Sequence, residues 1–328
     1  MNARTRLSLT LLRSVPLLLL AGVFACFASL SGRFLDPQNL INILIQSASL
    51  GIVGAGMTFV LITGGIDLSV GSIMFLSAAI AGKMVLNGLP LSLALPMVLV
   101  AGLAFGLANA FFISRFRILP FVVTLATLYA GRGLALYITE TRAMNLPEEL
   151  LRLGTGRALG LPLPIWVLGA TLLAAQLTLT RTTFGRQVYA VGNHAEGARK
   201  AGIAAIRVIV LVYAISGFCA ALGGLVSVAQ LGAVSPTFGN QREFAAIAAA
   251  VLGGTSLFGG RGRVFPGTIL GAVLIQTVES GLVIVNADPY LYPLILSSII
   301  FLAVLLDGLR HAHLERLGRT KIRPLPAG

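Results

Sequence analysis

The sequence predicts an all-α polytopic membrane protein that forms a single transmembrane domain over residues 1–328. Its composition is the first observation: 56% of the residues are hydrophobic and only 11% are charged, whereas a soluble domain is usually about one quarter charged. The second observation is that the apolar residues gather in runs approaching the ~20 residues that a helix needs to cross a bilayer. Together these exclude an ordinary soluble enzyme, and the hydrophobicity excludes disorder.

Ten apolar runs are candidate membrane spans, with eight as the lower count because several are short or rich in glycine. They cover roughly residues 14–32, 41–63, 70–88, 91–113, 118–138, 163–180, 205–231, 243–259, 264–285 and 290–307. Backbone polar groups in lipid must be bonded within their own segment, so we expect helices. A membrane β-barrel would alternate polar and apolar residues, and the run 294–306 does not.

The basic residues predict the orientation of these spans. The formal net charge is +13. With the N-terminus inside and ten spans, 17 of the 24 basic residues but only 4 of the 11 acidic residues fall on the inner side. This agrees with the positive-inside rule. It predicts cytosolic N- and C-termini and a basic cytosolic tail at 308–328. The charge therefore marks topology, and no nucleic-acid partner is predicted.

The segment 181–204 is the longest inner loop between two spans. Asn193 is placed to cap a short helix, Glu196 stands at its third position as in a capping box, and Gly202 is placed to end it. This pattern predicts a helix that docks onto a cytosolic partner. A plain solvated loop is the alternative.

Motifs for energy conversion within the chain are missing. A phosphate-binding loop ends in Gly-Lys-Ser or Gly-Lys-Thr, and none of the three lysines is followed by Ser or Thr. Any ATP hydrolysis must therefore come from another chain. The sequence shows neither a catalytic constellation nor a metal site, and we expect this chain to bind no cofactor. His311 and His313 are interpreted as part of the basic tail.

Three ionisable residues lie within or beside predicted spans. Arg132 and Glu279 stand late in their spans, where they could pair with each other or reach the outer interface. Asp67 lies in a glycine-rich bend, where it could cap the span that begins at about residue 70. No chain of protonatable groups is evident, which argues against a proton-driven carrier.

Uncharged polar residues within the spans could bond across helices or line a path for a hydroxylated solute. These candidates are Gln46, Asn109, Thr124, Thr127, Gln230 and Gln276.

A short pattern occurs twice. Gly64-Gly65-x-x-Leu68-x-x-Gly71 matches Gly253-Gly254-x-x-Leu257-x-x-Gly260, and each copy stands at the inner end of a predicted span. Internal repeats are common in transporters. We therefore treat Gly64, Gly65, Asp67, Ser69, Gly253 and Gly254 as a candidate structural or gating motif.

At this point the chain resembles a known family. The stretches 56–72 (GMTFVLITGGIDLSVGS), 120–127 (PFVVTLAT) with 132–135 (RGLA), 184–193 (FGRQVYAVGN) and 246–260 (AIAAAVLGGTSLFGG) are similar, in order, to motifs of the ribose-type permease subunits of bacterial ABC monosaccharide importers. Each motif alone is moderately specific, but together they cover nearly the whole chain.

This resemblance implies a multi-pass protein of the bacterial inner membrane that transports and is not itself an enzyme. It implies a permease homodimer or heterodimer in lipid, an outer sugar-binding protein, and a cytosolic tandem ATPase that binds ATP and Mg²⁺. The ATPase would receive a coupling helix formed by Asn193, His194, Ala195, Glu196, Gly197, Ala198, Arg199 and Gly202.

One position departs from the family pattern. An acidic residue often precedes the Ala-Ile-Ala-Ala run, but Ala245 stands there and the acid is at Glu243. This favours either a different sugar or the less direct member of a heterodimer. A permease for a nucleoside or an amino acid stays open, as do, more distantly, an ion-driven secondary carrier and a membrane enzyme.

Overall fold

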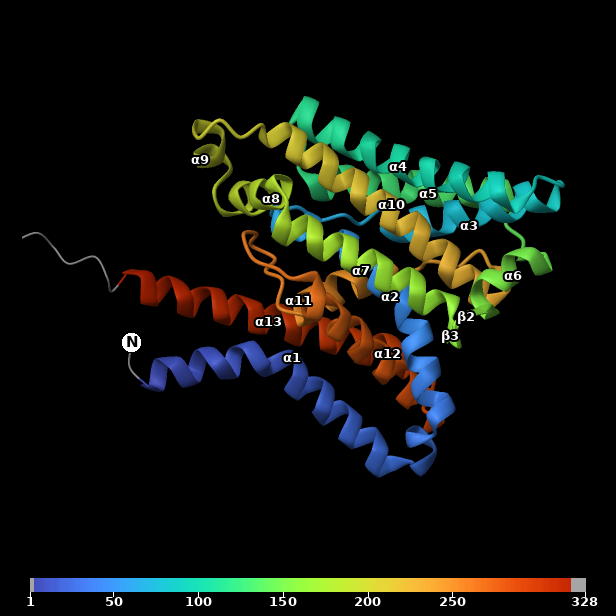
Figure 1. Cartoon of the computed structure of the whole chain (residues 1–328), viewed down its shortest axis with the longest axis horizontal. Coiled ribbons are helices and arrows are strands. Elements are labelled where there is room, and N and C mark those ends of the chain that lie inside the picture. Colours follow the sequence, from blue (N-terminus) through green and yellow to red (C-terminus); the bar gives the residue numbers. More distant parts are fainter. Residues whose placement is uncertain (1–2, 320–328) are drawn as a thin grey trace, which may run out of the picture.

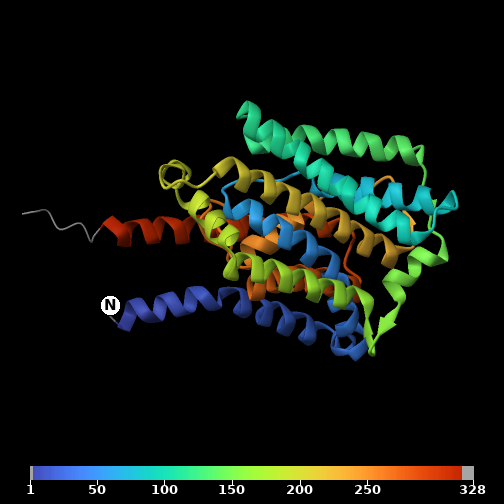
Figure 2. The same ribbon diagram turned by 45° about the horizontal axis from the view of Figure 1, so that its top comes forward.

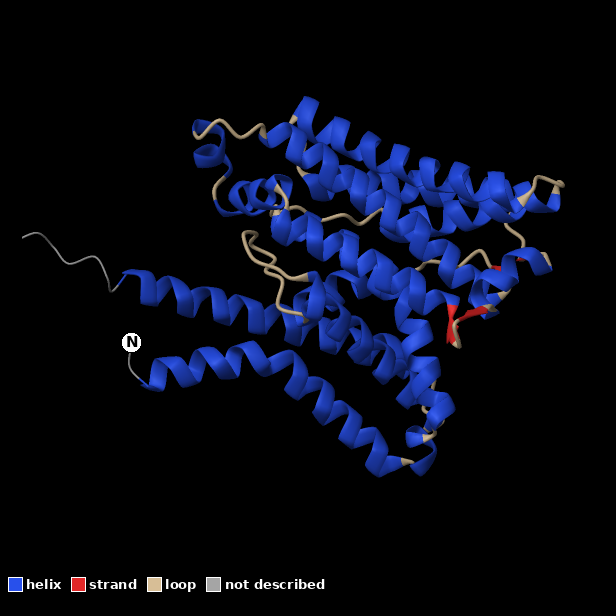
Figure 3. Cartoon of the chain, viewed as in Figure 1, coloured by secondary structure: helices blue, strands red, loops and turns tan. Residues whose placement is uncertain are grey.

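Long helices joined by short loops make up the computed structural model, which describes residues 3–319 (Figures 1 and 3). The helices are α1 (Ala3–Leu30), η1 (Gly32–Leu35), α2 (Pro37–Ile62), α3 (Val70–Leu86), α4 (Leu91–Phe116), α5 (Pro120–Thr139), α6 (Glu148–Thr155), α7 (Leu163–Arg181), α8 (Thr183–Asn193), α9 (Ala195–Lys200), α10 (Ala205–Leu231), α11 (Arg242–Leu252), η2 (Val264–Thr268), α12 (Ile269–Ile284) and α13 (Leu291–Arg319). Two antiparallel strand pairs complete the described chain: β1 (Met144–Asn145) with β4 (Ala233–Val234), and β2 (Arg157–Ala158) with β3 (Leu161–Pro162).

The predicted all-α membrane architecture is confirmed in its main features. Six described helical segments are long and apolar enough to cross a membrane: α2, α4, α5, α7, α10 and the stretch Val264–Ile284, in which η2 leads through a kink at Phe265 into α12. Shorter apolar helices cover Pro16–Leu30, Val70–Leu86 and Leu291–Leu302. Nine of the ten predicted spans therefore correspond to apolar helices, while the total number of crossings stays a prediction.

The span predicted at 243–259 is the exception. α11 has only 11 residues, or about 16 Å of helix, which is too short to cross a hydrocarbon core of ~30 Å. The helix ends at Leu252: Gly253 is its C-cap, and Gly254 adopts a φ of +94°, which takes the backbone out of the helix and which side chains disfavour. Residues 253–263 then form an irregular loop.

Helices α2 and α10 occupy the centre of the molecule, and both views show them surrounded by the others (Figures 1 and 2). The apolar window of α2 is 83% buried, against 22% for α4 and for α5. α4 crosses α10 through Gly102, Gly106 and Gly217, where any Cβ would collide with the facing backbone. Such glycine contacts let membrane helices approach closely.

Both described ends of the chain lie at the same end of the molecule as α8 and α9, opposite α6 and the β2–β3 pair (Figure 1). This arrangement agrees with the prediction that the termini and the loop 181–204 share one side of the membrane. The predicted basic tail is helical up to Arg319, and residues 320–328 lie outside the described residues.

Candidate coupling and translocation site

The two copies of the glycine pattern contact each other. We call residues 63–69, which follow α2, the first glycine loop, and residues 253–263, which follow α11, the second glycine loop. The backbone amide of Gly260 donates a hydrogen bond of 2.8 Å to the carbonyl of Ile62 at the end of α2. A Cβ on Gly259 would lie 3.2 Å from the amide nitrogen of Gly64. The sequence indicated the repeat but not this contact.

Helix α8 covers this junction. Gly192 lies so close that a Cβ would overlap the Ile62 carbonyl oxygen and lie 2.7 Å from the Gly260 nitrogen. The Tyr189 hydroxyl donates a hydrogen bond of 2.9 Å to the carbonyl of Gly262. Burial raises the pKa of the Tyr189 phenol, which keeps it protonated as a donor. α8 therefore contacts the end of α2 and the second glycine loop together.

Helix α9 follows α8 after a sharp turn, and the predicted short helix is present. Its N-cap is His194, whose Nδ1 accepts a hydrogen bond from the Gly197 amide at 3.3 Å. The predicted cap, Asn193, is therefore wrong by one residue, because α8 continues through Asn193. Glu196 pairs with Lys200 at 3.2 Å on the exposed face. Gly202, with a φ of +82°, follows the helix as predicted.

Asp67 is fully buried at the centre of a hydrogen-bond network. Its carboxylate accepts hydrogen bonds from the amide and hydroxyl of Ser69, at 3.0 and 2.6 Å, and from the Ser216 hydroxyl of α10 at 2.7 Å. The Asn109 amide of α4 donates to the Ser69 hydroxyl at 2.8 Å, and the Thr127 hydroxyl of α5 donates to Asn109 at 2.7 Å. The network therefore joins the first glycine loop to three helices.

The six predicted path residues divide into two groups. Asn109 and Thr127 belong to the Asp67 network, and Thr124 donates a hydrogen bond to the carbonyl of Ile66 in the same loop at 3.2 Å. The glutamines lie elsewhere: Gln276 donates to Gln46 at 2.7 Å, and Gln230 donates to the carbonyl of Ile45 at 3.1 Å. All six bond across elements of the fold, which was the alternative that the sequence left open. Their role in a solute path stays a prediction.

Sequence reasoning missed two partners of the first glycine loop. Ser216 binds Asp67, and the Tyr213 hydroxyl donates to the carbonyl of Ile66 at 3.3 Å. Both lie on α10, where they are separated by three positions and hence share a face. Polar side chains at such spacing within a span were the available signal.

The ionisable residues Arg132 and Glu279, which the sequence suggested as possible partners, pair with other residues instead. Arg132 lies over the ring of Phe75, 5.5 Å from its centroid, and donates to the carbonyl of Phe238 at 3.4 Å. It also attracts Glu243 electrostatically. Glu279 instead pairs with Arg242 at 3.6 Å. Tertiary packing, which hydropathy does not report, decides these partners.

Glu243 is the acidic residue that this chain carries near the place where the family often has one, which is occupied here by Ala245. Its side chain is buried and reaches back to Gly71, where a Cβ would collide with Oε2. Among the described side chains, Oε2 of Glu243 has no hydrogen-bond partner. The residue at the usual position, Ala245, lines the larger cavity of a neighbouring pair that shares Asn240 and Arg242.

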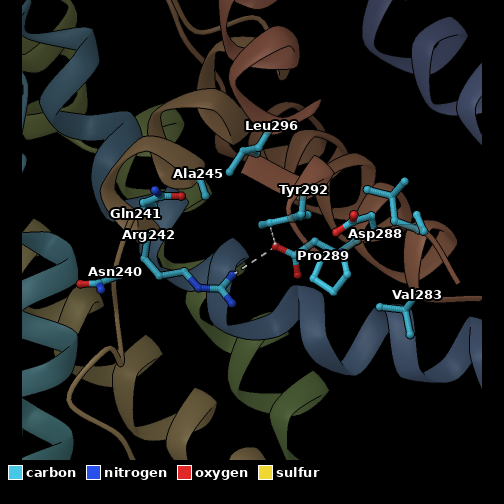
Figure 4. A pocket seen from close by; sticks show the side chains of 12 residues that line it. Asn240, Gln241, Arg242, Ala245, Val283, Asp288, Pro289, Tyr292 and Leu296 are labelled. Carbon is cyan, nitrogen blue, oxygen red and sulfur yellow. Dashed lines mark hydrogen bonds and ion pairs between the residues drawn. The ribbon is translucent and has the colours of Figure 1, made fainter. Parts of the chain in front are cut away.

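That larger cavity, of about 390 Å³, lies among α11, α12 and α13. Arg242 pairs with Glu279 at 3.6 Å, and the Glu279 carboxylate also accepts a hydrogen bond from the Tyr292 hydroxyl. Figure 4 shows Arg242 and Tyr292 pointing into this cavity. Most of the remaining wall is apolar, including Leu296 and Val283.

The smaller cavity, of about 220 Å³, lies among α3, the end of α10 and the connection between α10 and α11. It is lined by Met74, Ser227, Leu231, Ser235, Thr237, Phe238, Gly239, Asn240 and Arg242. Asn240 and Arg242 line both cavities.

Residues 39–306 match the family model described as "Branched-chain amino acid transport system / permease component". The chain belongs to this permease family. The resemblance to ribose-type permeases is also confirmed. The chain is 36% identical to the ribose import permease protein RbsC of Haemophilus influenzae, over 87% of this chain and 90% of the relative.

Two further relatives, both from Escherichia coli, extend this similarity. The identity is 36% with the D-allose transport system permease protein AlsC, over 89% of this chain and 90% of the relative. It is 33% with the xylose transport system permease protein XylH, over 84% and 86%. No solved structure matches the chain. Membership of this family and the apolar helices identify a multi-pass protein of the bacterial inner membrane and a transport component rather than an enzyme.

Proposed function

We propose that this chain is the membrane-spanning permease subunit of an ATP-driven importer for a monosaccharide. The observation that carries the proposal is the contact of α8, which leads directly into α9, with the end of α2 and the second glycine loop. It occurs in a chain that is similar over nearly its whole length to permeases for ribose, D-allose and xylose. A cytosolic protein that moves α8 would move the inner end of α2 and the second glycine loop together.

The other subunits follow from this role. A tandem ATPase, which binds the ATP and Mg²⁺, docks on α9, where Glu196, Arg199 and Lys200 are exposed. A sugar-binding protein delivers solute at the opposite end. The outward apolar faces of α4 and α5, which expose Phe111 and Tyr129 among others, suit contact with lipid and a second permease chain.

Reconstituted uptake tests the proposal directly. The chain is placed in proteoliposomes with its partner ATPase and binding protein, and uptake of D-ribose, D-allose, D-xylose and L-leucine is measured with and without ATP. We expect ATP-dependent uptake of at least one sugar and none by the chain alone. Uptake of L-leucine only would support the amino-acid alternative that the family description favours, and uptake driven by an ion gradient without the ATPase would overturn the proposal.

The coupling assignment has its own test. Replacing residues 196–202 with a flexible Gly-Ser linker of equal length is expected to abolish uptake while the ATPase keeps its basal activity. Charge reversal at Glu148 on α6, at the opposite end, is the control and is expected to leave uptake unchanged. If the linker variant imported sugar as well as the wild type, the assignment of α9 as the coupling helix would be wrong.

A further inference from the structure

The smaller outer cavity has an unusually polar wall for a protein of this hydropathy. Five of its nine lining residues carry polar side chains: Ser227, Ser235, Thr237, Asn240 and Arg242. Binding sites for small molecules combine a concave surface with a few convergent polar groups. At about 220 Å³ the cavity is far larger than the ~30 Å³ share of one water molecule. It is thus large enough for a ligand smaller than a drug-sized molecule.

The polar groups of this wall are available for a ligand. The hydroxyls of Ser235 and Thr237 bond to each other at 3.1 Å, and two hydroxyls that share one hydrogen bond still have a donor and acceptor positions to offer. Asn240 is exposed, and its amide supplies both donors and an acceptor. This set matches a solute whose surface alternates donors and acceptors in the same way, as the hydroxyls of a sugar ring do.

The backbone that carries these polar groups is fixed by hydrogen bonds and by one close contact with the backbone of Gly71. The amide of Phe238 donates to the carbonyl of Ser235 at 2.9 Å, and the amide of Asn240 donates to that of Thr237 at 3.1 Å. Arg132 donates to the carbonyl of Phe238 at 3.4 Å. Gly239, at a φ of +75°, approaches the backbone of Gly71 so closely that a Cβ would collide with the Gly71 carbonyl. A pre-ordered wall reduces the entropy lost on binding.

The charge of the wall favours an uncharged ligand. Arg242 is the one charged residue among the nine that line the smaller cavity, and its guanidinium pairs with Glu279 in the neighbouring cavity at 3.6 Å. The remaining polar groups are neutral hydroxyls and an amide. A charged solute would therefore lack an uncommitted counter-charge among these side chains, whereas a neutral polyhydroxylated solute needs none.

We propose that the smaller cavity is the outer solute subsite of the permease, which accepts one uncharged sugar ring, and that Ser235, Thr237 and Asn240 determine its specificity. The inference rests on the proposed function and deepens it. A sugar released at the outer end would exchange hydrogen bonds to water for bonds to these three side chains.

Protection from cysteine labelling tests the subsite without relying on transport. In a Cys26→Ala background, which removes the exposed native thiol, Ser235→Cys is introduced into the permease–ATPase complex in nanodiscs. The rate of maleimide labelling is measured with 50 mM D-ribose, D-allose, D-xylose or L-leucine, and with sucrose as the osmotic control. We expect the sugar that the wild-type complex imports to slow labelling at least threefold. The matched control is Thr155→Cys on exposed α6, where no protection is expected.

Two further variants distinguish a failure of the proposed subsite from a failure of the proposed function. Thr237→Cys replaces Ser235→Cys if the latter does not assemble, and Asn240→Ala added to the cysteine variant is expected to remove most of the protection. Equal labelling with and without sugar at both positions, in a complex whose wild type imports that sugar, overturns the subsite and leaves the proposed function standing. Protection by L-leucine alone also overturns it. A wild-type complex that imports no sugar overturns the proposed function instead.

Discussion

The two glycine loops share one sequence pattern but are held by different kinds of contact. The first is anchored by side chains, because Asp67 and Ser69 bond to α10 and α4. The second is anchored chiefly through its backbone, by the Gly260 amide on Ile62 and the Gly262 carbonyl on Tyr189. The difference teaches that two copies of one glycine pattern can be anchored in different ways, one with a buried carboxylate at the centre of its bonds and one with backbone groups of its glycines. The second loop is the one that a movement of α8 reaches through a side-chain hydrogen bond.

Breaking the contact of α8 with the end of α2 and the second glycine loop should have the largest effect. In Gly192→Ala the new methyl overlaps the backbone of Ile62, which cannot rotate away, so we expect a cost of about 3 kcal/mol and loss of coupled uptake. Thermal unfolding in detergent and uptake in proteoliposomes measure the two effects. Gly197→Ala is the control, since its nearest neighbour would be His194 Cγ at 3.5 Å. If Gly192→Ala imported sugar at the wild-type rate, this contact would not be required for coupled uptake.

Removing the anchor of the first loop should come next. Asp67→Ala leaves the Ser69 amide and the hydroxyls of Ser69 and Ser216 without their acceptor, at an expected cost of about 2 kcal/mol. Asp67→Asn keeps the shape and one acceptor oxygen and should cost less. Both costs are read from unfolding midpoints. If Asp67→Ala were as stable as the wild type, the side-chain hydrogen bonds of the first loop would not contribute to the stability of the fold.

Removing the hydroxyl that holds the second loop should have a smaller effect. Tyr189→Phe deletes one neutral hydrogen bond to the Gly262 carbonyl, so we expect about 1 kcal/mol and more ATP hydrolysed per sugar imported. Tyr137→Phe, at an 83% exposed position, is the matched control and should change neither value. A Tyr189→Phe complex with unchanged coupling would mean that α8 acts on the loop through Gly192 alone.

The smallest change is expected at Thr255 in the second loop. Its hydroxyl is buried with no hydrogen-bond partner among the described residues, so the near-isosteric Thr255→Val should be neutral or stabilising, by about 1 kcal/mol at most. Thr127→Val in the Asp67 network should instead destabilise by a similar amount, because Asn109 loses its donor. Equal effects of the two substitutions would remove the distinction between the loops.

The sequence predicted the parts of this architecture that depend on single segments. Apolar runs located nine of the apolar helices, and Glu196 with Gly202 located α9. Hydropathy predicts no helix at α8, because the short apolar stripe formed by Phe184, Val188 and Val191 on this segment gives no hydropathy peak. It predicts a full span at 243–259, because hydropathy does not report the positive φ with which Gly254 turns the backbone.

The candidate site was predicted less completely, because its contacts are tertiary. The pattern identified Asp67 and Gly253 as special positions, and the residues Asn109 and Thr127 did join Asp67. Their partner Ser216 is 149 residues away from Asp67 in the chain, and no periodicity reports such a distance. The same reason applies to Glu279, whose partner proved to be Arg242.

The short length of α11 has a consequence for the work that transport requires. α11 begins at Arg242, beside both outer cavities, and ends at the second glycine loop, so its ends are at most about 16 Å apart. That is roughly half of the ~30 Å hydrocarbon core. A sugar bound at Arg242 would therefore lie within about half a bilayer thickness of the second glycine loop, and each sugar hydroxyl left unbonded over that distance would cost free energy.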